Sequence, residues 1–394
     1  MNVLFVFISS LFFLWVFREI FFWITLWQNN GYRPDRFFTY LKKRTPKVYS
    51  FWSFFLALKW LFFFSFVFVI FDDDLLTVYQ YGIIFFYLLQ AFIIGKEIYA
   101  NHLKKPILTI RANLLIVLTL LSVFILFAFP LMDKFFWLLF IDLFIPVLVS
   151  SFVFLFLFPI ELYTDWQAEK ALKKIRLRKN LLVIGVTGSH GKSATKEIIA
   201  GILSYKFKVI KTDGKDNTAG GIARTILKKL ETDTEVFVAE LSAYKRGEIL
   251  ALCRFVHPKI GVITGINNQY MSLFNGLENI KKTNYELVEG LPVKGICLFN
   301  GMNKHTYPLY KKTKRKKSLY FVSNKEQIPE GSFIASHLIR TPKRISFDVR
   351  LNDKLIHLIV PASTNIEHLL PALYIANSLG MNEREIKKAV AALK

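Results

Sequence analysis

The most chemically informative stretch of this sequence is a glycine-rich turn that ends in a lysine and a serine. Residues 186–197 read VTGSHGKSATKE, with Gly188, Gly191, Lys192 and Ser193 in the turn. Glycines allow the main chain to approach an anion closely, and N–H groups at a helix start face that anion. These residue types predict a binding site for nucleotide phosphates. The general phosphate-loop pattern wants a glycine where Val186 stands, so the spacing belongs to a narrower class of loops.

The elements around the turn must be a strand before it and a helix after it. LLVIGVTG is a short apolar run typical of a buried parallel strand, and SATKEIIAGILSYK continues at helical spacing. Strand-like and helix-like segments then alternate through KVIKT, GGIARTILKKL, EVFVAEL, GEILALCRF, IGVITGI, LENIKKTNYELVEGL and KGICLFN. This alternation predicts an α/β domain with a mainly parallel, doubly wound sheet.

Polar side chains stand at the carboxyl ends of three predicted strands, where such sheets bind ligands. They are Thr187, Glu240 and Thr264. The predicted cleft is therefore already lined with polar groups.

Farther on, SFDVRLNDKLIHLIVP predicts a hairpin with Asn352-Asp353 at its turn, and TNIEHLLPALYIANSLG predicts a helix closed by Gly380.

The first 160 residues are of a different kind, because most of the 40 phenylalanines crowd there and charge is scarce. Five apolar runs are long enough for a hydrocarbon core about 30 Å thick. They lie near Val3–Trp27, Phe51–Phe71, Leu75–Gly95, Ile107–Met132 and Phe135–Leu162. The adjacent charges Arg18 and Glu19 interrupt the first run; they are expected to form a functional pair, or to place one charge at the membrane surface and the other against helices.

Loop charges give an orientation for these five predicted spans. Three breaks are basic, and the other two are short and acidic or neutral, Asp72-Asp73-Asp74 and Asp133-Lys134. Basic loops stay in the cytoplasm, so the predicted topology is a multi-pass inner-membrane protein with its N-terminus outside and its ATP-binding domain cytoplasmic. A cleaved signal peptide fits less well, since the first run is too long and no small-residue cleavage site follows it.

The formal net charge of +23 raises the question of nucleic-acid binding. Much of that charge lies in the membrane-proximal loops, where anionic headgroups account for it, and we predict no nucleic-acid partner. The one basic cluster in the second half, Lys311–Lys317, is expected to be a solvated or membrane-facing loop. Cys253 and Cys297 lack metal-ligand spacing and suit a reducing compartment.

Several segments, taken in order, resemble the Mur ligases, which extend the peptide of peptidoglycan precursors, and most of all the MurF members, which add D-alanyl-D-alanine. The segments are TGSHGKSATKE, TDGKDNTAGG, AELSAYKRGEI, PKIGVITGINNQYMSLFNGLENIKKTNYEL and TNIEHLLPALYIANSLG. They fall between Leu181 and Lys394 and resemble the central ATPase domain of that family.

The resemblance implies ATP-dependent amide formation through an acyl phosphate, with ATP and Mg²⁺ as cofactors. Lys192 and Glu240 are then the expected catalytic residues, with Lys192 on the β- and γ-phosphates. The N–H groups of Ser189 to Ser193 are expected to cradle phosphate oxygens. The expected nucleotide site consists of Gly188, Ser189, His190, Gly191, Lys192, Ser193 and Ala194, with Asn217 for substrate and with Ser193 and Glu240 for the metal.

Five positions depart from the family pattern. Tyr270 stands where a metal-binding histidine is usual, and Asn284 where a lysine is usually carbamylated. Gly265 replaces an asparagine, and Gly301 and Asn303 replace an aspartate pair. A phenol is a poor Mg²⁺ ligand and an amide cannot be carbamylated, so the second metal site is expected to be weakened or rebuilt.

The expected domains are a transmembrane helical domain (1–165), a basic juxtamembrane linker (166–180) and the ATP-binding central domain (181–394), with the C-terminal ligase domain absent or truncated. The sequence favours a membrane-anchored ligase whose partners are a UDP-linked or lipid-linked muropeptide and an amino-acid or dipeptide amine, with other cell-wall enzymes as further partners. A non-catalytic nucleotide-binding scaffold or regulator of cell-wall synthesis is the alternative. An ATP-powered transporter is disfavoured, because no second nucleotide motif is present.

Overall fold

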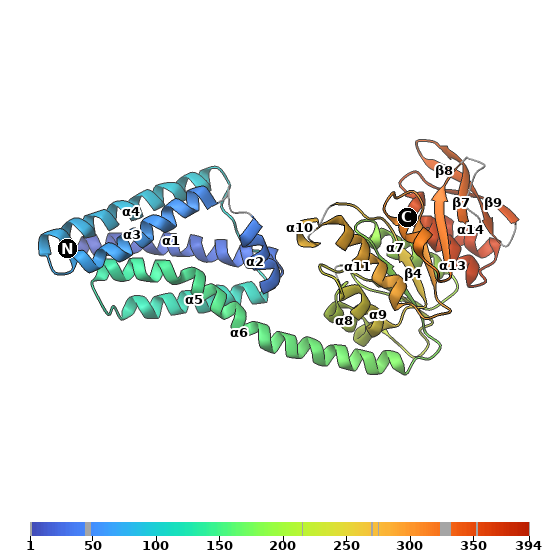
Figure 1. Cartoon of the computed structure of the whole chain (residues 1–394), viewed down its shortest axis with the longest axis horizontal. Helices are drawn as coiled ribbons and strands as arrows, with labels where there is room; N and C mark the ends of the chain where they lie inside the picture. The colour runs from blue at the N-terminus through green and yellow to red at the C-terminus, as the bar shows by residue number, and fades with distance from the viewer. Residues whose placement is uncertain are drawn as a thin grey trace. The chain divides into compact units, whose positions relative to one another are not determined.

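The chain divides into two compact units, Met1–Glu161 and Leu162–Lys394, here called unit 1 and unit 2. Figure 1 shows the computed structural model, which describes residues 2–43, 49–214, 216–268, 271–274, 276–323, 332–351 and 354–393. Among these residues unit 1 is helical, and all strands belong to unit 2. Helix α6 (Lys134–Arg176) runs through the boundary, so residues 166–176 of the expected linker are helical.

All five apolar runs fall on helices. They are α1 (Asn2–Asn29), α3 (Tyr49–Val69), α4 (Asp73–Tyr99), α5 (Ile110–Ala128) and α6, with the short α2 (Pro34–Lys43) after the first. Within the described residues, α1, α4, α5 and α6 are long and apolar enough to cross a membrane, judged by length and composition alone, and α3 adds the shorter apolar stretch Phe55–Val69. That all five span a bilayer stays a prediction.

The acidic breaks between the apolar runs begin helices. The Asp72 carboxylate accepts hydrogen bonds from the N–H groups of Asp74 and Leu75, each at 3.0 Å. Asp133 caps the first turn of α6 in the same way. A carboxylate at a helix start satisfies N–H groups that have no partner within the helix and suits the helix dipole. The residues that mark these breaks in the sequence therefore also fix where two helices begin.

Charged side chains inside unit 1 are paired across helices. Arg18 donates to Glu97 of α4 at 2.8 Å and lies 3.3 Å from Glu19. Lys59 of α3 pairs with Asp142 of α6 at 2.8 Å. Arg18 and Glu19 are both buried, so the expectation that one of them reaches the surface is wrong. Each buried charge instead finds a partner, as burial in an apolar medium requires.

The described residues of unit 2 form a nine-stranded sheet in the order β2-β3-β1-β4-β5-β6-β7-β8-β9. The pairings from β2 to β7 are parallel, and β7, β8 and β9 pair antiparallel. The strands are β1 (Leu182–Thr187), β2 (Val209–Lys211), β3 (Val236–Glu240), β4 (Ile260–Ile263), β5 (Ile296–Asn300), β6 (Lys317–Val322), β7 (Ser332–Arg340), β8 (Arg344–Leu351) and β9 (Lys354–Pro361). The predicted mainly parallel α/β fold is confirmed.

Helices cover both faces of this sheet (Figure 1). Successive β1 residues alternate between the two cores, Ile184 in one and Val183 in the other. One face carries α7 (Lys192–Leu203), α13 (Ile366–Ser378) and α14 (Glu383–Ala391). The other carries α8 (Ala219–Lys229), α9 (Glu248–Val256), α11 (Leu277–Gly290) and α12 (Thr306–Lys312), with the short α10 (Met271–Phe274) before α11. Because β1 lies between β3 and β4, the ends of these three strands meet at one edge of the sheet.

Two later segments differ from the sequence prediction. The expected loop Lys311–Lys317 is the end of α12, a turn and the first residue of β6. Lys317 Nζ donates to the carbonyls of Tyr310 and Thr313, at 2.8 and 2.7 Å, so this lysine closes the C-terminus of α12. The other basic side chains of the cluster are exposed, as expected for a solvated segment. The predicted hairpin is confirmed as the antiparallel pair β8–β9, but its turn at Asn352-Asp353 lies outside the described residues.

Both cysteines of the chain lie in the interior of unit 2 and are expected to report its folding. Cys253 is 1% exposed and Cys297 is fully buried. Burial raises the pKa of Cys253 to about 12, helped by the negative charge of Glu286, and burial also raises the pKa of Cys297 well above its usual value. Since the thiolate is the reactive form, a maleimide should label neither thiol in the folded chain and both after denaturation in urea. Rapid labelling of either cysteine under native conditions would contradict this packing.

Candidate functional site

The predicted phosphate turn lies between the end of β1 at Thr187 and the start of α7 at Lys192. Helix α7 follows because Lys-Ser-Ala-Thr-Lys-Glu begins a run whose buried side chains recur at helical spacing. Its first internal hydrogen bond runs from the Thr195 N–H to the Gly191 carbonyl at 2.9 Å. The N–H groups of Lys192, Ser193 and Ala194 therefore have no acceptor within the helix and are available to an anion.

Two glycines of the turn are required by their conformation and their close neighbours. Gly188 has φ +146°, and a Cβ there would lie 2.1 Å from Thr264 Oγ1. Gly191 has φ +79°, and a Cβ there would lie 2.5 Å from Cε1 of His368. A side chain at either position would force the turn away from its neighbours. The tertiary contacts thus explain the glycine spacing seen in the sequence.

The turn is also tied to the end of β4. The N–H groups of Ser189 and His190 both donate to the Gly265 carbonyl, at 2.6 and 3.4 Å. Thr264 Oγ1 donates to the His190 carbonyl at 2.6 Å. The expectation that all five N–H groups from Ser189 to Ser193 cradle phosphate is therefore wrong for the first two, because a backbone carbonyl already accepts from them.

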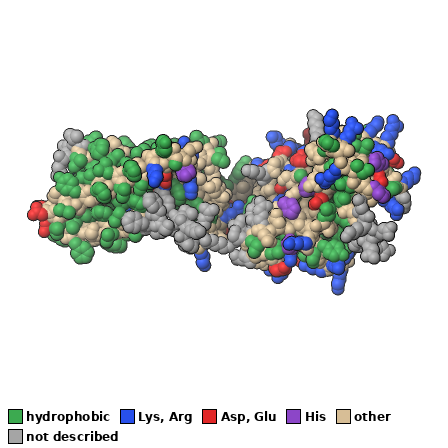
Figure 2. Space-filling model, turned by 90° about the horizontal axis from the view of Figure 1, so that it is seen from above, with side chains coloured by type: hydrophobic (Ala, Val, Ile, Leu, Met, Phe, Trp, Pro, Cys, Tyr) green, Lys and Arg blue, Asp and Glu red, His purple; other side chains and the backbone are tan. Residues whose placement is uncertain are grey.

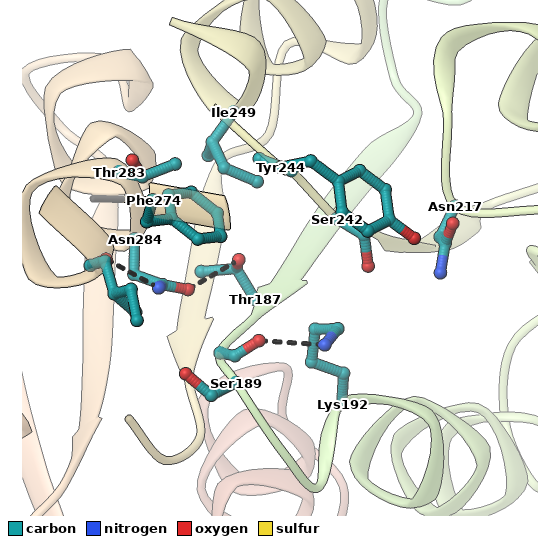
Figure 3. A pocket seen from close by; sticks show the side chains of 13 residues that line it. Thr187, Ser189, Lys192, Asn217, Ser242, Tyr244, Ile249, Phe274, Thr283 and Asn284 are labelled. Carbon is teal, nitrogen blue, oxygen red and sulfur yellow. Dashed lines mark hydrogen bonds between the residues drawn. The ribbon is translucent and has the colours of Figure 1, made fainter. Parts of the chain in front are cut away.

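A cavity of about 110 Å³ opens beside the turn (Figure 3). Its lining residues come from the end of β1, from α7, α9, α10 and α11, and from the loops that follow β1, β2 and β3. They are Thr187, Gly188, Ser189, Lys192, Asn217, Ser242, Ala243, Tyr244, Ile249, Phe274, Ile280, Thr283 and Asn284. Lys192 is the one charged side chain among these lining residues, and the other polar groups are hydroxyls and amides. Such a lining suits an anionic ligand.

Lys192 closes the turn on the cavity side. Its Nζ donates to the Gly188 carbonyl at 2.8 Å, as the dashed line in Figure 3 shows. Burial lowers the pKa of Lys192, and the nearby negative charge of Glu240 opposes that shift. An ammonium group held over the turn and partly stripped of water interacts strongly with a phosphate that enters the cavity.

Glu240 lies at the end of β3 and is 2% exposed. Its Oε1 accepts from Asn217 Nδ2 at 3.2 Å, and its backbone N–H donates to Thr212 Oγ1 at 3.0 Å. Its Oε2 lies 3.5 Å from Nζ of Lys196. Asn217 therefore links the carboxylate to the cavity, since Asn217 lines the cavity and Glu240 lies behind it.

The structure brings together some of the predicted site residues and leaves others apart. Gly188, Ser189, Lys192 and Asn217 line the cavity, and Glu240 contacts Asn217. The remaining predicted residues, His190, Gly191, Ser193 and Ala194, do not line it. His190, Ser193 and Ala194 are solvent-exposed. Ser193 and Ala194 still contribute N–H groups to the first turn of α7.

The departures from the family pattern are built into the structure as neutral contacts. Asn284 accepts from Thr187 Oγ1 at 3.1 Å and donates to the Ile280 carbonyl at 2.8 Å, so both ends of its amide are engaged. Asn303 donates to a backbone carbonyl at 3.1 Å, and Gly301 packs close to Leu319. Tyr270 lies outside the described residues.

Sequence reasoning missed two residues beside the turn. Lys196 follows Lys192 by one helical turn on the apolar face of α7, and this position was the signal that it is buried. His368 of α13 contacts Thr195 Oγ1 through Nδ1 at 3.2 Å and lies against Gly191. Burial lowers the pKa of His368. No sequence signal indicated His368, because α13 is distant in the chain.

The residues present fit a magnesium ion that is shared with a nucleotide. Glu240 Oε2 is a buried oxygen that accepts no hydrogen bond among the described residues, and a carboxylate is a ligand that Mg²⁺ prefers. In the described part of the chain no three His, Cys, Asp or Glu side chains are grouped to hold a metal. Phosphate oxygens and water would therefore have to complete the coordination, as is common for Mg²⁺.

The turn gives a prediction with a matched control. Gly191→Ala and Gly380→Ala both place alanine at nearly the same φ, +79° and +74°, and this backbone conformation alone should cost each variant about 1–2 kcal/mol of stability. A Cβ at Gly380 meets open space, whereas one at Gly191 meets His368. Binding of a fluorescent ATP analogue should therefore weaken at least about tenfold in Gly191→Ala alone. Equal affinities in the two variants would show that this contact does not shape the site.

Comparison with known proteins gives this geometry a context. Residues 186–376 match the Mur ligase middle domain. The UDP-N-acetylmuramoyl-tripeptide–D-alanyl-D-alanine ligase of Bacillus subtilis is 37% identical over 119 residues, which cover 30% of this chain and 26% of that enzyme. The enzyme of that name from Borreliella burgdorferi is 30% identical over 211 residues, which cover 52% of this chain and 43% of that enzyme.

A solved structure agrees with the sequence matches. The MurF ligase of Thermotoga maritima, crystallised in complex with ADP, aligns with a TM-score of 0.50 at 25% identity, covering 59% of this chain and 52% of that one. This chain spans less than half the length of the two curated relatives.

Proposed function

We propose that this chain, whose residues 186–376 form a Mur ligase middle domain, is a membrane-anchored, ATP-dependent ligase of peptidoglycan precursors. The relatives named above join D-alanyl-D-alanine to a UDP-linked muramoyl tripeptide by name, and we assign a MurF-like amide-forming reaction to this chain. The acceptor is a UDP-linked or lipid-linked muropeptide, and the incoming amine is an amino acid or dipeptide.

The observation that carries the proposal is the phosphate turn. Three N–H groups at the start of α7 and the Lys192 ammonium lie at the end of β1, beside a cavity with no carboxylate in its described lining. In the proposed reaction a carboxylate oxygen attacks the γ-phosphorus of ATP, ADP leaves, and the amine then displaces phosphate from the acyl phosphate, losing a proton. Negative charge gathers on the transferring phosphoryl oxygens, which is where Lys192 and the amides act.

Glu240, Ser193 and Asn217 complete the proposed roles. Glu240 and the Ser193 hydroxyl would hold Mg²⁺, which when bound neutralises phosphate charge. Asn217 orients the Glu240 carboxylate through its 3.2 Å hydrogen bond and presents the rest of its amide to the cavity for substrate. The hydroxyls of Ser242, Tyr244 and Thr283 line the same cavity and offer further hydrogen bonds.

Membrane anchoring is supported by the surface of unit 1. Large apolar side chains there are widely exposed, with Phe71 at 91% and Ile110 at 90%. Figure 2 shows hydrophobic side chains over much of the visible face of this unit. An apolar surface of this extent would cause aggregation in water, whereas lipid would cover it. The basic loops of the sequence support a topology with the N-terminus outside and unit 2 in the cytoplasm.

This topology predicts a protease result. In intact spheroplasts, added proteinase K should leave unit 2 uncut, and in inverted membrane vesicles it should digest unit 2. Antibodies against a tag placed after Lys394 would follow the fragment on a gel. Digestion of the tagged unit in intact spheroplasts would place the nucleotide site outside and end the proposal of a cytoplasmic ligase.

A nucleotide-binding scaffold is the second candidate, and Asn284 favours it. Both ends of its amide are engaged within the protein, and an amide cannot form the carbamate that the resemblance expects at this position. A scaffold would keep the phosphate turn but need not turn ATP over. In this alternative the chain descends from a ligase, keeps the nucleotide-binding site and has lost catalytic activity.

Turnover separates the two candidates. The purified full chain in detergent receives ATP, Mg²⁺, D-alanyl-D-alanine and the tripeptide-bearing precursor in UDP-linked or lipid-linked form, and ADP release is measured. A ligase releases ADP only when both the precursor and the amine are present. Nucleotide binding without such release, in both forms of the precursor, would favour the scaffold.

A further inference from the structure

Lys196 is a fully buried lysine that the proposed reaction does not use directly. It lies on the inner face of α7, and its side chain is 1% exposed. Its Nζ lies 3.5 Å from Glu240 Oε2 and 3.4 Å from Glu197 Oε1. Glu197 is about half exposed and also pairs with Lys211, so Glu240 is the buried counter-charge of Lys196.

The pair is held by charge more than by hydrogen bonding. Neither Lys196 Nζ nor Glu240 Oε2 has a hydrogen-bond partner among the described residues. A buried ammonium group and a buried carboxylate each need an opposite charge nearby to offset the loss of water, and here each supplies that charge to the other. Glu240 Oε2 is nevertheless the oxygen left without a hydrogen bond, and it is the atom that a metal ion would seek.

The charges near the cavity disfavour the binding of a divalent cation without a nucleotide. Lys192 lines the cavity, Glu240 contacts the lining residue Asn217, and Lys196 lies 3.5 Å from Glu240. The charge of Glu197, 3.4 Å from Lys196, is offset by its pair with Lys211, so two ammonium groups remain for the one carboxylate of Glu240. The group carries a net single positive charge. A divalent cation that approached Glu240 alone would be repelled, whereas a triphosphate, with about four negative charges, reverses the sign of the local field.

We propose that Lys196 is an internal counter-ion that neutralises Glu240 in the nucleotide-free protein, so that the site takes up a divalent cation only together with a triphosphate. The inference rests on the proposed function for the assignment of Glu240 to the metal, and it adds an order of binding to that assignment. Lys196 is a positioning residue, because it acts through Glu240 and does not line the cavity.

Mn²⁺ binding to the full chain in detergent tests this order. Electron paramagnetic resonance measures free Mn²⁺, with and without a non-hydrolysable ATP analogue. The unmodified protein should show no saturable binding below about 1 mM without nucleotide, and clear binding with it. Lys196→Gln, whose amide can donate to Glu240 Oε2, should bind Mn²⁺ without nucleotide at least about tenfold more tightly than the unmodified protein.

Three further variants make the test specific. Lys196→Arg keeps the charge and should behave like the unmodified protein. Lys196→Gln combined with Glu240→Gln should lose the new Mn²⁺ binding, because the ion would bind through Glu240. Lys211→Gln removes a lysine that pairs with Glu197 on the exposed side and should leave Mn²⁺ binding unchanged. A purely structural ion pair would alter stability in Lys196→Gln but create no metal site.

Two results would overturn the proposal. One is a Lys196→Gln protein that is folded, as shown by protected Cys253 and Cys297 thiols, and binds Mn²⁺ no better than the unmodified protein. The other is an unmodified protein that binds Mn²⁺ equally well with and without the analogue, and this result needs no variant to fold. Failure of the proposed ligase reaction gives a different pattern, namely no ADP release that depends on both substrates, while Mn²⁺ binding with and without the analogue can still be measured.

Discussion

Replacing Lys192 with alanine is expected to lower substrate-dependent ADP release by about a thousandfold or more. The Lys192 ammonium is the one charge among the described residues that line the cavity, and it is fixed over the turn by its 2.8 Å bond to the Gly188 carbonyl. Apart from the proposed Mg²⁺, charge that develops on the phosphoryl oxygens would then meet only amides and hydroxyls of the described lining. Binding of ATP should weaken less than turnover, because the N–H groups of α7 remain.

The measurement compares ADP release and binding of a fluorescent ATP analogue in the same preparation. Lys228→Ala is the matched control, since Lys228 is an exposed lysine in the last turn of α8, a helix of the same unit. It should leave both quantities unchanged. A Lys192→Ala protein with protected thiols and full turnover would remove Lys192 from the proposed mechanism.

Replacing Glu240 with alanine is expected to lower the free energy of unfolding of unit 2 by about 3 kcal/mol. The change leaves the buried Lys196 ammonium with Glu197 alone, at 3.4 Å, and Glu197 is solvent-screened. Removal of one partner of a buried pair costs about 3–5 kcal/mol, and the remaining partner places this case at the low end. Glu240→Gln keeps the volume and isolates the loss of charge.

Labelling of Cys253 and Cys297 with a maleimide across a urea series measures this stability in the full chain, because both cysteines lie within unit 2. Adding Lys196→Met to Glu240→Gln should restore much of the loss, since no unpaired charge then remains. If the double variant loses as much free energy of unfolding as the two single variants lose together, the two side chains do not interact and the charge argument fails.

The central part of unit 2 could be predicted closely because its signals are local. The strand before the turn and the helix after it were read from an apolar run, a glycine-rich stretch and helical spacing, and they appear as β1 and α7. The alternation through β5 held in the same way. By contrast β6, β7 and α12 were not predicted, because the basic residues from Lys311 to Lys317 are typical of a solvated loop. The role of Lys317 depends on its contacts with Tyr310 and Thr313.

The sequence by itself determined the phosphate turn, the parallel α/β plan, the apolar helices of the first unit and the candidate residues Lys192 and Glu240, since residue type, spacing and period are properties of neighbouring positions. Only the tertiary structure decided that the Gly265 carbonyl accepts hydrogen bonds from the N–H groups of Ser189 and His190. It also decided that the Asn284 side chain both accepts and donates a hydrogen bond, and that Lys196 pairs with Glu240. These contacts join strands and helices far apart in the chain. Their energies depend on burial and on the distance between charges, and neither quantity is set until the sheet and its helices have packed.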